Sequence, residues 1–193
     1  VSGLVKAVRD QAITKTVSVS EVPTQPYSNA RKIQILPVKF FYNDGNGNIS
    51  GSTSGAILAL EYALSRGAKV VNMSWGSQGS DSYSQALYET LAELYANNIV
   101  LVAAAGNSAI NTDSIPFFPS ALNTSIPGLI SVGSITTTYN SGNTLTGLSM
   151  SYFSNYGRTS VDVSAPGSMF LPSYDNYYAG LISANAYYPE ETN

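Results

Sequence analysis

The chain has no cysteine and no histidine among its 193 residues. Without cysteine it can form no disulfide, thiolate metal site or cysteine nucleophile, and without histidine it lacks the usual general base and the commonest metal ligand. Charged residues are also scarce, at 11%, and the formal net charge is -3. Because so few basic side chains cannot neutralise many phosphates, we expect no nucleic-acid partner.

Long hydrophobic runs are missing as well. Apolar stretches such as Ile99 to Ala105 are far shorter than the roughly 20 residues that cross a bilayer, and no cationic start precedes an apolar signal segment. We therefore expect no membrane partner, and any export signal would lie outside these residues.

The abundant residues predict a folded protein and fit an exported one. Hydrophobic residues make up 44% of the chain, enough for one sizeable core, so we predict a single domain over residues 1–193. The chain is poor in Lys and rich in Asn, Ser, Thr, Gly and Tyr, a composition that fits a secreted or cell-surface microbial enzyme.

Apolar strands alternate with amphipathic helices along the sequence, which is typical of an α/β fold with a mostly parallel sheet and helices packed on it. Helices are predicted at Val1 to Val8, Ser54 to Arg66 and Ser82 to Ala96. Strands are predicted at Lys32 to Phe40, Lys69 to Ser74, Ile99 to Ala104, Leu129 to Ser134 and Val161 to Val163, followed by a turn at Ala165 to Gly167. The remainder, residues 168–193, shows no periodicity.

Two of the predicted strands end in small and polar residues. One finishes in Gly106 and Asn107, and the other in Ser74, Trp75 and Gly76. Ligands of open α/β sheets bind outside the carboxyl ends of strands, so an Asn107 amide there can donate to a developing oxyanion, and a Ser-x-Gly backbone can pair with an extended peptide. Taken alone, Gly-Asn is more often a turn and a single Trp more often a core residue.

These two segments, Val71 to Gly76 and Ala103 to Asn107, resemble motifs of the subtilisin family of serine proteases, in the family's order and separation. Further segments resemble the same family: Leu36 to Phe40 leading to Gly45-Asn46-Gly47, Phe117 to Ser120, and Phe153 to Gly157 followed by Val161 to Gly167. The resemblance covers residues 1 to about 167, and jointly the motifs are specific.

The resemblance implies a three-layer, subtilisin-like α/β fold with helices on both faces of the sheet, and a polypeptide substrate. By it, Asn107 is the side-chain donor to the oxyanion. The two edges between which the peptide lies are Gly45, Asn46 and Gly47 on one side and Ser74, Trp75 and Gly76 on the other. Ala104, Ala105 and Gly106 line the first specificity pocket, and the bulky Trp75 narrows the neighbouring apolar subsites.

The catalytic triad is where the sequence departs from the family. The family's Asp, His and nucleophilic Ser match no residue here, and the Ser52-Thr53-Ser54 stretch has Thr where a nucleophile elbow needs Ser. Val1 to Leu4 resembles the continuation of the family's His-Gly-Thr helix, and Asn193 stands near the expected Gly-Thr-Ser-Met. We therefore expect a partial peptidase domain whose triad lies outside the chain, and we expect the chain alone to be inactive.

The missing parts also affect the partners we expect. If the family's central Asp strand and Ser helix are absent, the apolar faces of Lys69 to Ser74 and Ile99 to Ala104 lose their cover. The partner would be the remaining segments of the protease domain or another chain.

Alternative functions stay open beside the serine endopeptidase. A catalytically inactive pseudoprotease or peptide-binding module would use the same cleft without chemistry. A nucleotide-binding module is disfavoured because no strand is followed by Gly-x-Gly-x-x-Gly or a phosphate loop. No cofactor is predicted: calcium is possible by family, but the Asp44 to Asn48 loop is followed by Ile49 where the sharp-turn Gly is required, and no ligands can be assigned.

Overall fold

The computed structural model describes residues 34–43, 45, 49–140, 144–171 and 176–179. Contacts divide the chain into two compact units, Val38–Ala179 and a second unit made of Val1–Pro37 with Gly180–Asn193. Nearly all described residues belong to the first unit. The helix predicted at Val1 to Val8 lies outside the described residues.

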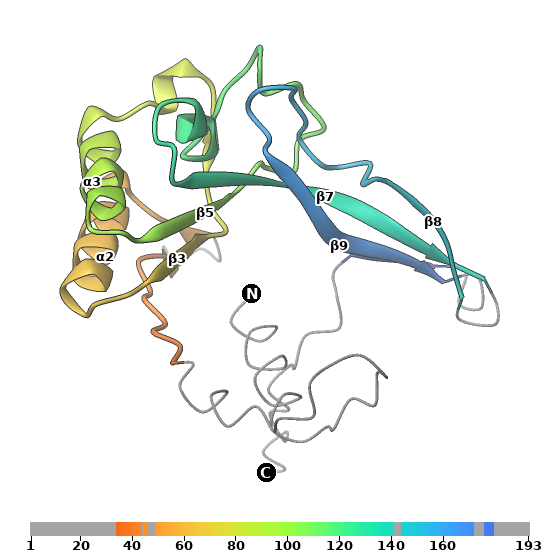
Figure 1. The fold of residues 1–193 in the computed structure, drawn as a ribbon, viewed down its shortest axis with the longest axis horizontal. Coiled ribbons are helices and arrows are strands. Elements are labelled where there is room, and N and C mark those ends of the chain that lie inside the picture. Colours follow the sequence, from red (N-terminus) through yellow and green to blue (C-terminus); the bar gives the residue numbers. More distant parts are fainter. Residues whose placement is uncertain (1–33, 44, 46–48, 141–143, 172–175, 180–193) are drawn as a thin grey trace, which may run out of the picture. The chain divides into compact units, whose positions relative to one another are not determined.

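A six-stranded sheet forms the centre of the first unit, in the order β10-β9-β7-β5-β3, with β8 also paired to β7 (Figure 1). Its parallel strands are β3 (Val70–Met73), β5 (Val100–Ala104), β7 (Leu129–Tyr139) and β9 (Val163–Leu171), and the antiparallel ones are β8 (Leu145–Met150) and β10 (Asn176–Ala179). This confirms the predicted α/β class with a mostly parallel sheet.

Two short pairs of strands lie outside this sheet. β1 (Tyr42–Asn43) pairs with β2 (Ile49–Ser50), and β4 (Ser77–Gln78) pairs with β6 (Phe117–Phe118), both antiparallel. The short 3-10 helices η2 (Ser80–Ser82) and η3 (Ser120–Thr124) connect other elements. The β4–β6 pair is the one that shapes the candidate site.

The two predicted internal helices are confirmed. Helix α2 (Thr53–Ser65) begins at Ser52, whose hydroxyl accepts a hydrogen bond from the Gly55 N–H at 3.0 Å. Helix α3 (Gln85–Ala96) is capped in the same way by Ser84, and it starts later than predicted because residues 80–82 form η2.

The hydrophobic core lies between these helices and the first strands of the sheet. α2 and α3 lie side by side next to β3 and β5 (Figure 1), so the described helices form one layer. Leu87, Leu91 and Leu94 recur at helical spacing on α3, and all three are buried. Leu101 from β5 is fully buried beneath them. Each such leucine contributes about 1.5–3 kcal/mol relative to an exposed one.

The structure corrects one strand prediction and one turn prediction. The described part of the segment predicted at Lys32 to Phe40, residues 34–40, forms no strand. The predicted turn at Ala165 to Gly167 is instead part of β9, where Ala165 and Pro166 pair with β7 and a register shift follows. Such an irregularity lets a strand hold Pro, whose missing N–H would interrupt a regular ladder.

The strand predicted at Leu129 to Ser134 continues as β7 to Tyr139, because Ile135 to Tyr139 are residues that favour extended backbone. β8 and β10 were not predicted.

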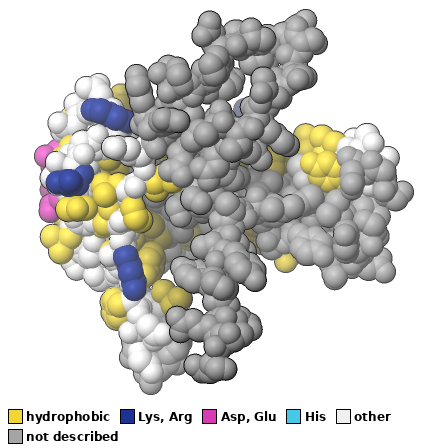
Figure 2. Space-filling view, turned by 90° about the horizontal axis from the view of Figure 1, so that it is seen from below, with side chains coloured by type: hydrophobic (Ala, Val, Ile, Leu, Met, Phe, Trp, Pro, Cys, Tyr) yellow, Lys and Arg dark blue, Asp and Glu magenta, His cyan; other side chains and the backbone are white. Residues whose placement is uncertain are grey.

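Apolar side chains reach the surface of the described part between isolated Lys and Arg side chains (Figure 2). Val70 and Val100, paired across β3 and β5, are 61% and 44% exposed. The other apolar residues of these two strands are buried or half-buried, so the expected loss of cover stays a prediction. Among the described residues, no helix has the length and apolarity to cross a membrane.

Candidate functional site

The two segments predicted to form the site leave the sheet at the same edge. β3 and β5 are parallel neighbours, with Met73 opposite Ala103. Ser74–Gly76 follows the end of β3, and Ala104–Asn107 begins at the last residue of β5. Ser74 and Gly76 are exposed, whereas Ala105 is 1% exposed and anchors its segment in the core. The structure therefore brings together the strand-end segments that the sequence pointed to.

Asn107 stands at the end of this buried segment with its side chain exposed. It follows Gly106, whose φ of 106° is a conformation that residues with a β-carbon rarely adopt. Its amide makes no hydrogen bond to any other residue in the described part of the chain. The donor predicted for an oxyanion is thus not engaged by these residues.

Asn155 holds the loop that carries Asn107. Its side chain is 1% exposed; its Nδ2 donates to the Ala105 carbonyl at 2.8 Å, and its Oδ1 accepts from the Ser108 and Ile110 N–H groups at 2.8 and 3.3 Å. The backbone N–H of Asn155 also donates to the Gly106 carbonyl at 2.9 Å. The buried side-chain amide of Asn155 therefore binds backbone groups on both sides of Asn107 in the sequence, a set of contacts we call the Asn155 bracket.

Asp113 fixes the far end of the same loop. Its carboxylate accepts hydrogen bonds from the N–H groups of Arg158, Thr159 and Ser160 at 2.7–3.1 Å and from the hydroxyls of Thr159 and Ser160 at 2.8 and 2.7 Å. The hydroxyl of Ser160 and then that of Thr159 are the largest causes that hold the pKa of Asp113 well below its ordinary value of 3.8. Sequence reasoning found neither Asp113 nor this role of Asn155.

The ring of Phe117 lies between the two strand-end segments. A β-carbon at Gly76 would overlap with Cε1 of this ring and stand 2.8 Å from Cζ. A β-carbon at Gly106 would stand 3.0 and 3.1 Å from Cε2 and Cδ2, on the opposite edge. The ring is therefore enclosed by two glycines, one from each segment.

The Subtilase family matches this sequence over residues 28–192. The chain belongs to the subtilase family. It is 33% identical over 163 residues to subtilisin-like serine protease Pen c 1 of Penicillium citrinum, covering 82% of this chain and 36% of that protein. Subtilisin DY of Bacillus licheniformis is 29% identical over 171 residues, which cover 88% of this chain and 55% of that protein.

Solved structures show a similar likeness. A cold-adapted subtilisin-like serine proteinase shares 30% sequence identity with a TM-score of 0.46, covering 64% of this chain and 38% of that one. The subtilase chain described here thus spans about a third to a half of these relatives. The predicted family is confirmed.

The other predicted edge of the subtilase cleft is described only at Gly45. This residue has a φ of 86° in the turn between β1 and β2, and its N–H donates to Asn43 Oδ1 at 2.9 Å. Asn46 and Gly47 lie outside the described residues. Their place in the cleft stays a prediction.

Trp75 is half-buried and packs against other apolar side chains. Its half-buried ring meets Phe40 edge to face, with ring centroids 5.3 Å apart, and contacts the hydrophobic core. The structure thus supports the packing interpretation of Trp75, and its predicted effect on the apolar subsites stays a prediction.

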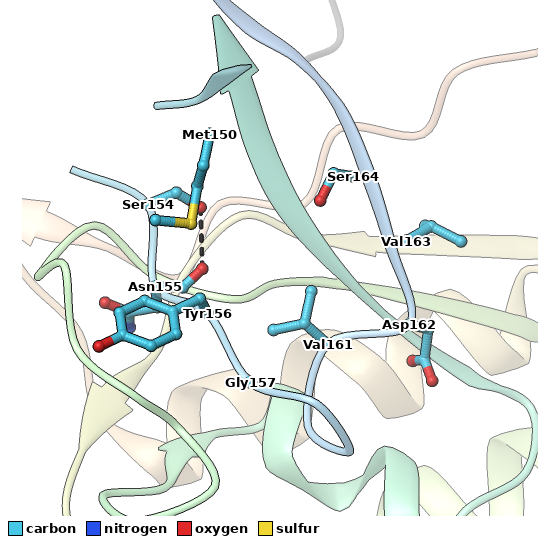
Figure 3. Close-up of a pocket in the computed structure, with 9 residues that line it drawn as sticks. All are labelled: Met150, Ser154, Asn155, Tyr156, Gly157, Val161, Asp162, Val163 and Ser164. Carbon is cyan, nitrogen blue, oxygen red and sulfur yellow. Dashed lines mark hydrogen bonds between the residues drawn. The ribbon is translucent and has the colours of Figure 1, made fainter. Parts of the chain in front are cut away.

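A separate hollow of about 280 Å³ lies between the end of β8, the loop that follows it and the start of β9 (Figure 3). It is lined by Met150, Ser154, Asn155, Tyr156, Gly157, Val161, Asp162, Val163 and Ser164, and so by none of the predicted site residues. The Ser154 hydroxyl accepts from the Ser134 N–H and donates to the Asn155 carbonyl, the bond drawn in Figure 3. The described residues contain no group of three His, Cys, Asp or Glu that could hold a metal ion.

Proposed function

We propose that this subtilase chain supplies the oxyanion donor and the peptide-binding cleft of a serine endopeptidase. The Asp, His and Ser of the triad are provided by polypeptide outside the 193 residues, either the rest of the same protein or another chain. The observation that carries this proposal is the placement of Ser74–Gly76 and Ala104–Asn107 at one edge of the sheet, with the Asn107 amide free of bonds to other described residues.

In this mechanism, the peptide lies as an added strand between Gly45–Gly47 and Ser74–Gly76 and pairs with their backbone groups. Attack by the serine converts the scissile carbonyl oxygen into an oxyanion. The Asn107 Nδ2–H then donates a hydrogen bond that is stronger to the oxyanion than to the carbonyl oxygen. Removing such a donor from subtilisin, the family's namesake, lowers the rate about 100- to 1,000-fold.

The same sequence features support a location outside the cell, secreted or on the cell surface, because the low Lys content and the abundance of Asn, Ser and Thr fit an exported enzyme. A catalytically inactive module that binds peptides in the same cleft is the second candidate. It is favoured by the lack of histidine in the residues at hand.

The test uses the full-length protein. We expect labelling by a serine-reactive fluorophosphonate and hydrolysis of casein-derived peptides, with kcat reduced about 100- to 1,000-fold in Asn107→Ala and KM little changed. Ser108→Ala is the matched control, because its side chain is also exposed and its hydrogen bond to Asn155 uses the backbone N–H. Peptide binding without labelling or hydrolysis would support the inactive module and refute the protease.

A further inference from the structure

We infer that Phe117 fills the first specificity pocket and restricts it to small side chains, so that this protein selects peptides with Gly, Ala or Ser before the scissile bond. The inference rests on the proposed function, because it takes Ala104–Gly106 and Ser74–Gly76 as the walls of that pocket. With the ring between these walls, only peptides with a small side chain before the scissile bond fit.

The position of the ring is set by the backbone on both sides of it. Phe117 is opposite Gln78, and Phe118 is opposite Ser77, in the β4–β6 pair. The Phe117 carbonyl accepts a hydrogen bond from the Ser120 hydroxyl at 2.8 Å, and the neighbouring Pro116 carbonyl accepts one from the Gly79 N–H at 2.8 Å. The backbone around Phe117 is thus hydrogen-bonded to β4 and Gly79, which follow Gly76 in the chain.

Alternation along β6 separates its two aromatic rings. Phe118 packs against the hydrophobic core and meets Tyr83 edge to face, with ring centroids 5.6 Å apart. Successive side chains of a strand point to opposite faces, so Phe117 is directed away from the core ring and between Gly76 and Gly106.

The two glycines show how little room remains. A single added carbon at Gly76 would overlap with the Phe117 ring and lie 2.5 Å from the Phe118 carbonyl oxygen, and one at Gly106 would overlap with Asn155 Nδ2 and stand 3.0 Å from the ring. The space that a large substrate side chain would need between these walls is therefore already occupied by a benzyl group of the protein itself. A methyl or hydroxymethyl group needs far less space.

The first experiment compares peptide substrates that differ only in the residue before the scissile bond, Ala or Phe, using the full-length protein. We expect kcat/KM to favour Ala at least about tenfold in the wild type, and Phe117→Ala to reverse the preference. Phe117→Leu, which keeps an apolar side chain should the alanine variant not fold, would give an intermediate ratio. Phe118→Ala removes a ring of the same size on the core side and should leave the ratio unchanged.

The second experiment does not need activity. Removing the ring opens a benzyl-sized space between the two glycine walls, and an apolar space of that size can bind benzene. In ligand-observed NMR, benzene should bind the full-length Phe117→Ala protein and not the full-length wild type. A wild type that cleaves after Phe as readily as after Ala, or that binds benzene as the variant does, would overturn the inference. Absence of all hydrolysis and fluorophosphonate labelling would instead sink the proposed function, and the benzene result would still report whether the ring fills the slot.

Discussion

Ser160 donates two hydrogen bonds to Asp113 across 47 residues of sequence, one from its backbone N–H at 3.0 Å and one from its hydroxyl at 2.7 Å. With the bonds from Arg158 and Thr159, they tie the loop that begins at Asn107 to the turn that precedes β9. These donors favour the ionised carboxylate, so the contact couples the fold to pH.

Asp113→Asn tests this coupling. A folded pKa below 3.8 means that the carboxylate adds stability above that pH, and that this contribution is lost as pH falls through the folded pKa. We expect the variant to unfold at lower urea concentration than the wild type at about pH 7, with a difference that shrinks by about pH 2–3.

Glu61→Gln is the control for this measurement, because it removes an exposed carboxylate of α2 that bonds to no other described residue. A constant difference between Asp113→Asn and wild type at all pH values would contradict the role assigned to the ionised carboxylate.

The bracket formed by Asn155 gives a second prediction. Asn155→Ala leaves the Ala105 carbonyl and the Ser108 and Ile110 N–H groups without their partner. A buried polar group without a partner lowers the free energy of unfolding by about 1–3 kcal/mol. We expect that loss in urea unfolding, and faster hydrogen exchange at Ser108 and Ile110. Asn107→Ala, which changes an exposed amide of the same loop, should stay within about 0.5 kcal/mol of the wild type. Equal losses in both variants would refute the bracket.

The sequence predicted those helices and strands in which burial produces a recognisable pattern of apolar residues. α2, α3, β3 and β5 carry apolar residues at helical spacing or in short continuous runs, and all four were found within a few residues of their true ends. β8 was missed because its Ser, Thr and Gly residues show no apolar alternation, and most of its side chains are exposed. β9 was misjudged because Pro166 and Gly167 read as a turn in isolation.

The candidate site divides in the same way. Asn107 and the segment Ser74–Gly76 follow apolar strands, and the rule that ligands bind at the carboxyl ends of such strands predicted their place. Asn155 and Asp113 act through contacts that span 45–50 residues, and no local pattern reveals such pairs. The position of Phe117 depends on the β4–β6 pairing, which is also long-range. The sequence therefore did not reveal that Asn155 and Asp113 hold the Asn107 loop or that Phe117 lies between the two strand-end segments.

The core of the described unit gives a third prediction, with a control on the same helix. Leu60 is 4% exposed and Leu58 is 66% exposed, and both belong to α2. Leu60→Ala should lower the free energy of unfolding by about 2–5 kcal/mol, through lost burial and the cavity left behind. Leu58→Ala should change it by no more than about 0.5 kcal/mol. Similar effects of the two variants in urea titrations would show that α2 does not pack as described.

The last prediction concerns the 193-residue chain by itself. Serine proteolysis needs a nucleophile made reactive by a base, and this chain has no histidine to take the proton. The hydroxyl of Ser154, which lines the hollow beside β8, already accepts from the Ser134 N–H and donates to the Asn155 carbonyl. We therefore expect the purified chain neither to hydrolyse peptides nor to react with a fluorophosphonate. Turnover by this chain that Asn107→Ala abolishes would show that the triad is replaced by groups within it, and would remove the reason for seeking the triad elsewhere.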